Sequence, residues 1–216
     1  MGGYVAFVLL VILAVSIRGI EVSGWDQAAE AVRWYALFIG VHVGWSVLPL
    51  HVTHGQTRRE FMAQVAMFVA TFAAALGLMV AITFVAEAGL YNLAGWPQEV
   101  EDHQLYRSAL EFHLVFLQSW LLVALWCAGG LFIAATWYRS DGLGGLALGL
   151  GIVVSGISGI SFSTDWGPFG SVYEHLTGDQ SVSYPVGVAL HLGLIALMLG
   201  LTWLAVRSVP IRNKGA

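Results

Sequence analysis

The sequence predicts an all-α membrane protein with six transmembrane helices, and three observations support this prediction. Hydrophobic residues make up 58% of the 216 residues and charged residues only 10%, against roughly 25% charged in a soluble domain. The mean hydropathy is +0.77. The charges gather in short clusters between long neutral runs. No linker or repeat divides the chain, so we expect a single transmembrane domain over residues 1–216.

Six apolar runs are long enough to cross a bilayer as helices. A bilayer core of about 30 Å requires about 20 helical residues, with every backbone polar group bonded inside the segment. The runs are Gly3 to Ile20, Trp34 to His51, Phe61 to Ala86, Leu110 to Tyr138, Leu143 to Ser161 and Tyr184 to Val206. No basic residue precedes the first run and further spans follow it, so we expect it to be retained and not cleaved as an export signal.

Basic residues predict that both termini are cytoplasmic. Lys and Arg near the ends of spans favour the cytoplasmic side of the membrane. One set of loops holds Arg58, Arg59, Arg139, Arg207, Arg212 and Lys214, whereas the other set holds Arg18, Arg33 and Arg107. Most carboxylates fall in the second set of loops. We therefore expect a basic inner face and an acidic outer face.

Small residues at every third or fourth position predict close helix packing in two spans. The third span has Ala63, Ala66, Ala70, Ala73 and Gly77, and the fifth has Ala147, Gly151, Ser155 and Gly159. A static contact between helices is the expected use of these residues, and a sliding surface is the alternative.

The segment from His51 to Phe61, between the second and third spans, is the most informative part of the chain. Gly55 is expected to end the preceding helix. Thr57 and Glu60 have the spacing of a capping box, which would start the next helix. We therefore expect a tightly turned polar corner on the cytoplasmic side. The simpler interpretation is a plain turn with two arginines that anchor the topology.

Histidines and the single cysteine do not form a recognisable metal or cofactor motif. His51 and His54 could share a helix face, but a zinc site needs more ligands than this loop supplies. A haem held by two histidines is disfavoured because the expected depths of His42, His113 and His191 differ. His103 and His175 lie in outer loops, and Cys127 is expected to be a buried thiol. We expect no metal and no cofactor on this chain.

Soluble-enzyme signatures are also missing from the sequence. It has no phosphate-binding glycine loop, no zinc-protease motif, no serine nucleophile motif and no basic patch for nucleic acid, so we expect no catalytic residue and no nucleic-acid partner. Charged and aromatic residues near the outer ends of spans instead form a candidate outer gate: Glu87, Trp96, Glu111, Asp165 and Trp166. The carboxylates of Glu87 and Glu111, at the ends of their spans, are expected to reach water.

The corner from His54 to Phe61, which enters a long alanine-rich helix, resembles that of the membrane subunits of type-2 ATP-binding-cassette (ABC) exporters, particularly small actinobacterial permeases. The similarity extends to Glu87 at the end of the third span, to Gly95-Trp96, to Tyr138-Arg139 before a glycine-rich fifth span, and to the basic tail from Arg207 to Lys214. It covers the chain from about Trp34 onward.

The resemblance implies a plasma-membrane permease subunit that pairs with a second, identical or related permease. Each copy would dock a separate ABC ATPase subunit, which would carry the ATP and magnesium. The implied coupling residues are His51, Thr53, His54, Gly55, Thr57, Arg58, Arg59, Glu60 and Phe61, with the two arginines facing acidic groups of the ATPase. Family members usually begin with a basic amphipathic helix, which the start of this sequence does not match.

Two other functions stay open at this point. One is an intramembrane electron carrier with haem on His42, His113 or His191. The other is an accessory membrane subunit without its own transport path. For a transporter, the shortage of deep charges favours a lipid, a hydrophobic peptide or a drug-like substrate. Membrane lipid is the remaining expected partner.

Overall fold

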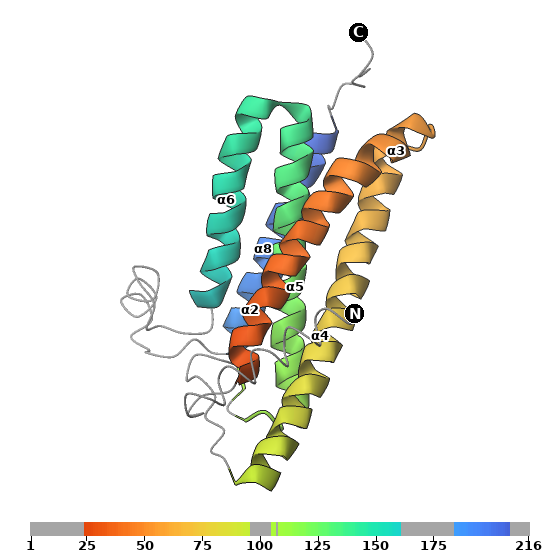
Figure 1. Cartoon of the computed structure of the whole chain (residues 1–216). Helices are drawn as coiled ribbons and strands as arrows, with labels where there is room; N and C mark the ends of the chain where they lie inside the picture. The colour runs from red at the N-terminus through yellow and green to blue at the C-terminus, as the bar shows by residue number, and fades with distance from the viewer. Residues whose placement is uncertain (1–23, 96–104, 107, 161–183, 208–216) are drawn as a thin grey trace, which may run out of the picture.

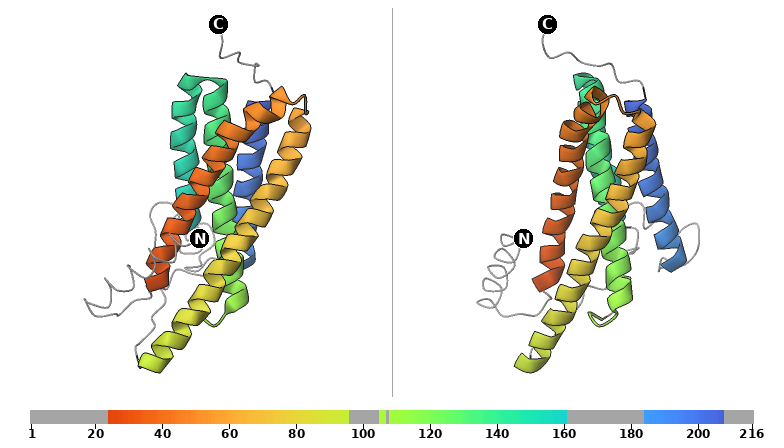
Figure 2. Two further views of the ribbon diagram at one scale, coloured as in Figure 1. Left: turned by 45° about the vertical axis from the view of Figure 1, so that its right-hand side comes forward. Right: turned by 90° about the vertical axis from the view of Figure 1, so that its right-hand side faces the viewer.

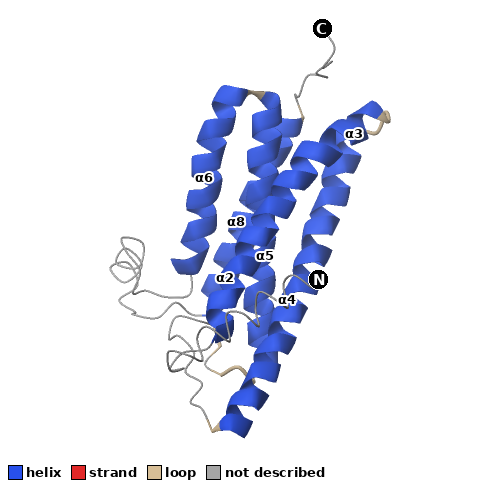
Figure 3. Ribbon diagram, in the orientation of Figure 1, coloured by secondary structure: helices blue, strands red, loops and turns tan. Residues whose placement is uncertain are grey.

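The computed structural model describes residues 24–95, 105–106, 108–160 and 184–207. Regular structure in these ranges is entirely helical, and Figure 3 shows the described part as helices with a few short loops. In chain order the helices are α2 (Gly24–His42), η1 (Val43–Val47), α3 (Leu48–Thr53), α4 (Arg58–Ala94), α5 (Phe112–Arg139), α6 (Asp141–Ile160) and α8 (Tyr184–Val206). The predicted all-α fold class is confirmed for this part of the chain.

Four described helices are long and apolar enough to span a membrane, which indicates a membrane protein. They are Ala31–Thr53, Arg58–Ala94, Phe112–Arg139 and Pro185–Val206, and they match the predicted second, third, fourth and sixth spans. The predicted fifth span lies in α6, whose described apolar stretch, Gly142–Ser155, is shorter than a span. The predicted first span, Gly3 to Ile20, lies outside the described residues.

Helix α5 forms the centre of the bundle. It packs against α2, α4, α6 and α8, which surround it in Figures 1 and 2. Every residue from Leu121 to Thr136 is buried. A helix that is apolar on all faces can be covered by protein or by lipid, and α5 is covered by protein. The middle of a single copy is therefore occupied by α5.

Helices α2 and α5 approach closely because glycines remove the side chains between them. A Cβ atom added to Gly40 would collide with the carbonyl oxygen of Cys127, and one added to Gly130 would collide with the carbonyl oxygen of Leu37. One turn after Gly40, a Cβ on Gly44 would lie 2.7 Å from the Ala134 Cβ. This Gly-x-x-x-Gly contact was not among the predicted small-residue seams.

The predicted seam of the third span meets α5 only in part. Ala73 and Gly77 are buried, and a Cβ on Gly77 would lie 3.0 Å from the backbone nitrogen of Trp120. Ala63 and Ala70 are exposed and Ala66 is half-buried, because the buried stripe of α4 advances by four residues through Phe61, Val65, Val69, Ala73 and Gly77. Helix α4 therefore requires small residues only near the point where it crosses α5.

The predicted small-residue seam of the fifth span belongs to α6 and packs against α5. Ala147, Gly151 and Ser155 are buried, and a Cβ on Gly151 would lie 2.8 Å from the Ile133 side chain. Ser155 Oγ would lie 2.8 Å from a Cβ on Gly129. The fourth member, Gly159, lies near the end of α6.

The second predicted span is one continuous helix with a local change of winding. Pro49 has no N–H group, and its ring crowds the carbonyl of Trp45, four residues earlier, so that carbonyl cannot accept a normal α-helical bond. The π-helical turn η1 precedes this position, and the chain then continues as α3. A π turn absorbs one extra residue and allows the helix to continue.

Three chain features meet at one end of the bundle in Figure 1: the corner between α3 and α4, the turn between α5 and α6, and the end of α8. This end carries Arg58, Arg59, Arg139 and Arg207, and we call it the arginine end. Arg212 and Lys214 lie outside the described residues. Which side of the membrane this end faces stays a prediction.

Candidate functional site at the corner between α3 and α4

The start of α4 is fixed by a reciprocal capping box. The Thr57 hydroxyl accepts a hydrogen bond from the Glu60 backbone N–H at 3.2 Å, while the Thr57 backbone N–H donates to Glu60 Oε2 at 2.8 Å. The Thr57 hydroxyl also donates to the same carboxylate oxygen at 2.9 Å. The predicted capping box is confirmed, and it leaves the first turn of α4 little freedom.

The end of α3 is closed by Gly55 in a left-handed conformation. Its φ is +74°, a region that residues with a Cβ seldom adopt. The Gly55 N–H donates to the Val52 carbonyl at 3.1 Å, and the His54 N–H donates to the Leu50 carbonyl at 3.1 Å. These bonds use carbonyls that a free helix end would leave unpaired. The predicted helix break at Gly55 is confirmed.

His51 and Phe61 attach the corner to the interior of the bundle. Phe61 is 1% exposed and His51 is 8% exposed, and their rings make an edge contact with centroids 5.4 Å apart. The Nε2 atom of His51 is buried and has no hydrogen-bond partner within the described part of the chain. These two predicted coupling residues therefore lie beneath the surface of the corner.

The other predicted coupling residues form the accessible surface of the corner. Those that are exposed are Thr53, His54, Gly55, Thr57, Arg59 and Glu60, together with Gln56. Nδ1 of His54 donates to the Leu50 carbonyl at 2.7 Å, and the Thr53 hydroxyl donates to the same oxygen at 2.9 Å. Local bonds thus hold the polar side chains of α3 in place.

Arg58 and Arg59 have different environments although they are adjacent. Arg58 is half-buried, and its Nη1 donates to the Arg207 carbonyl at the end of α8, at 3.0 Å. Arg139, at the end of α5, donates in the same way to the Leu204 carbonyl at 3.2 Å. Arg59 is exposed and forms no side-chain hydrogen bond or ion pair with another described residue. Arg58 thus links the corner to α8, and Arg59 is available to a partner.

The electrostatics of the corner centre on Glu60. Hydrogen bonds from the backbone and the side chain of Thr57 lower the pKa of this carboxyl below its ordinary value of 4.5, and nearby His51 lowers it further. Glu60 is therefore ionised at neutral pH. Its negative charge lies in the first turn of α4, where it is favourable for the helix dipole.

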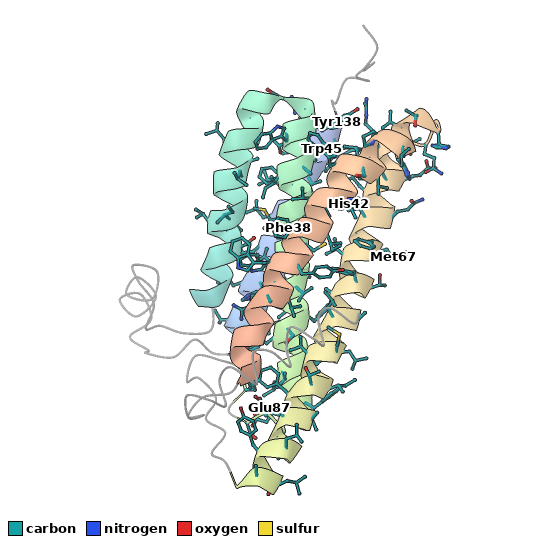
Figure 4. The ribbon with its side chains drawn as sticks, in the orientation of Figure 1. Phe38, His42, Trp45, Met67, Glu87 and Tyr138 are labelled. Carbon is teal, nitrogen blue, oxygen red and sulfur yellow. The ribbon has the colours of Figure 1, made fainter. Side chains whose placement is uncertain are left out.

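The candidate outer gate lies at the opposite end, and the structure describes only two of its members. Figure 4 shows Glu87 near the far end of α4, about 44 Å along this helix from Arg58 at 1.5 Å per residue. Glu87 is only 2% exposed, so the expectation that it reaches water is wrong for this chain. Glu111 precedes α5 as its N-cap residue. Trp96, Asp165 and Trp166 lie outside the described residues.

The described residues before α5 pack against this end of α4, and this packing was not predicted from the sequence. Leu105, Tyr106 and Ala109 are buried. Tyr106 makes an edge contact with Phe84 of α4 at a centroid distance of 5.6 Å. The Leu105 N–H donates to Gln118 Oε1 of α5 at 2.6 Å. This segment therefore packs across the ends of α4 and α5.

The described histidines and the cysteine do not converge on a metal or haem site. No group of three or more His, Cys, Asp or Glu side chains in the described ranges could hold a metal ion. Measured along their helices from the arginine end, His42, His191 and His113 lie at about 17 Å, about 23 Å and about 39 Å. His42 and His113 are exposed, whereas His191 and Cys127 are buried. His103 and His175 lie outside the described residues.

Comparison of the chain with protein-family models, with curated proteins and with solved structures finds no match. Function is therefore inferred from the residues and geometry of the chain itself.

Proposed function

We propose that this chain is the membrane-spanning permease subunit of an ATP-driven exporter, and that its His51 to Phe61 corner docks a separate ATPase subunit. The observation that carries the proposal is the construction of this corner. An exposed polar surface stands on a frame whose helix ends are both closed by hydrogen bonds. A corner that transmits a displacement from an ATPase must be rigid, and hydrogen bonds at both helix ends provide that rigidity.

The corner also has routes by which a displacement would reach the rest of the bundle. Helix α4 begins in the capping box and continues for 37 residues, about 55 Å, without interruption. Phe61 and His51 anchor its start in the apolar core. Arg58 connects the same start to the end of α8. Movement of the corner would thus be passed to α4 and α8 together.

The central position of α5 favours a transport path between two copies over a path inside one copy. Helix α5 occupies the space that a single bundle would need for a lumen. We therefore propose six spans with both termini in the cytoplasm, a plasma-membrane location, and a dimer with an identical or related permease. ATP and magnesium would be bound by the ATPase. The substrate would be a lipid, a hydrophobic peptide or a drug-like compound.

The same filled centre supports a second candidate, an accessory membrane subunit without a transport path. The two functions differ in reconstitution. A permease with its ATPase alone would move substrate across a vesicle membrane, whereas an accessory subunit with the same ATPase would not.

The direct test is recovery of the ATPase from cells. The tagged full-length chain is extracted in a mild detergent, purified, and its partners are identified. We expect an ATPase to co-purify, and Arg59→Glu to remove it by charge repulsion from the acidic surface proposed on the ATPase. Asn92→Glu is the matched control, because it adds a negative charge at an exposed position near the other end of α4. A chain that remains alone, or equal recovery with both variants, would refute docking through the corner.

A further inference from the structure

Two arginines from different helices converge on the last turn of α8. Arg58 of α4 donates to the Arg207 carbonyl at 3.0 Å, and Arg139 of α5 donates to the Leu204 carbonyl at 3.2 Å. Residues three apart lie on one face of a helix, with about 4.5 Å between them along the axis. The two guanidinium groups are therefore held on the same side of the end of α8.

The bond from Arg139 orients its guanidinium group without neutralising it, because the acceptor is an uncharged carbonyl. Arg139 and Arg207 are exposed, and neither forms an ion pair with another described residue. The described acidic residues at this end are Glu60, whose carboxylate is bonded in the capping box, and Asp141, which begins α6. Positive charge is thus concentrated where α4, α5 and α8 meet.

We propose that Arg139 and Arg207, which lie beside Arg58, bind the phosphate of an anionic membrane lipid. A guanidinium group has five N–H donors, so Arg139 keeps donors for a phosphate oxygen beside its bond to the Leu204 carbonyl. Arg139 and Arg207 end apolar helices, at the level where lipid headgroups meet water. Trp137 is 36% exposed on the last turn of α5, and Tyr138, the next residue, lies near the arginine end in Figure 4, as expected for aromatic side chains at a membrane interface.

The position between helix ends favours a lipid over a protein as the source of the phosphate. Basic pockets between transmembrane helices bind anionic headgroups, whose acyl chains can lie along the apolar helices. Exposed apolar side chains continue along α8, including Trp203 and Leu204. The proposal requires only insertion in a membrane, so it does not depend on docking of an ATPase.

The test measures the apparent affinity of the full-length chain for phosphatidylglycerol and phosphatidylcholine by native mass spectrometry in neutral detergent. We expect the wild type to bind phosphatidylglycerol more tightly. Arg139→Ala should weaken this binding about fivefold, the factor for one basic residue near an anionic surface, and leave phosphatidylcholine unchanged. Arg59→Ala is the control. The Arg59 side chain is exposed and carries the same charge as that of Arg139, but it makes no bond to the end of α8, so the preference for phosphatidylglycerol should persist in this variant.

Further measurements distinguish a lipid site from diffuse charge attraction and from binding of a free anion. Arg139→Lys keeps the charge but loses the planar fork, so we expect an intermediate affinity and an unchanged circular dichroism spectrum. No preference for phosphatidylglycerol in the wild type would overturn the proposal. Equal losses in Arg59→Ala and Arg139→Ala would indicate diffuse attraction and also overturn it. Displacement of the lipid by millimolar inorganic phosphate would assign the site to a free anion instead.

Discussion

The contact between α2 and α5 predicts that two glycine-to-alanine substitutions will change stability in opposite directions. In Gly40→Ala, the new methyl group meets the main chain of α5 at the Cys127 carbonyl and lies 3.0 Å from the Leu131 nitrogen. In Gly200→Ala, on the exposed face of α8, it meets nothing within 4 Å. Both substitutions gain about 1 kcal/mol from the higher helix propensity of alanine. The difference between them therefore isolates packing.

The expected magnitudes follow from these surroundings. Overpacking costs about 1 to 3 kcal/mol, and the upper end applies to Gly40 because main-chain atoms cannot rotate away. The net change is a loss of about 2 kcal/mol for Gly40→Ala and a gain of about 1 kcal/mol for Gly200→Ala. For a chain of this length, about 2 to 4 °C of melting temperature corresponds to each kcal/mol.

Thermal unfolding in one detergent, followed by circular dichroism, measures both variants. A melting temperature for Gly40→Ala at or above that of Gly200→Ala would show that α2 and α5 do not approach at this glycine.

Three other substitutions test single interactions by the same unfolding assay. Arg58→Ala should lower stability by about 1 to 2 kcal/mol because it removes a charged hydrogen bond, whereas Arg59→Ala should stay within about 0.5 kcal/mol. A loss in Arg59→Ala as large as in Arg58→Ala would contradict their different environments. The lowered pKa of Glu60 means that its stabilising effect is complete above pH 4.5 and is lost as the pH falls through the folded-state pKa. Thr57→Ala should cost about 1 kcal/mol and reduce this acid sensitivity, and a titration in which both proteins lose stability in parallel would refute the capping role. Trp120→Phe should cost about 1 kcal/mol, since the indole N–H donates to the Ala70 carbonyl at 3.0 Å; an unchanged melting temperature would rule out that bond.

Local signals in the sequence located the described helices but only some of their ends. Of the six spans predicted from apolar length, four match described helices, and the spacing of Thr57 and Glu60 identified the start of α4. Helix α2, however, begins at Gly24, ten residues before the predicted span, and α4 continues to Ala94, eight residues beyond the predicted end. Both signals depend only on residues close together in the chain. The Gly40 and Gly44 contact also has a local signature, the Gly-x-x-x-Gly spacing, and it could have been found by the same reasoning.

Other features depend on contacts that sequence spacing does not encode. Ala66 and Ala70 share a small-residue pattern with Ala73 and Gly77, yet only the latter pair is buried, because the crossing point with α5 decides which small residues are needed. Glu87 was expected near water and is buried instead. Nearby, Tyr106 packs against Phe84 of α4, and a contact of this kind cannot be read from charge or hydropathy.

The two corner arginines show how this limit affects inferences about function. By resemblance, Arg58 and Arg59 have one role, and a double substitution would be the natural test. Arg58, however, bonds to a carbonyl 149 residues away, so its loss would disturb α8 whether or not an ATPase docks. A defect in the double variant would therefore not distinguish docking from folding. Arg59 has no such bond, so a transport defect in Arg59→Glu with unchanged stability would implicate the corner surface itself.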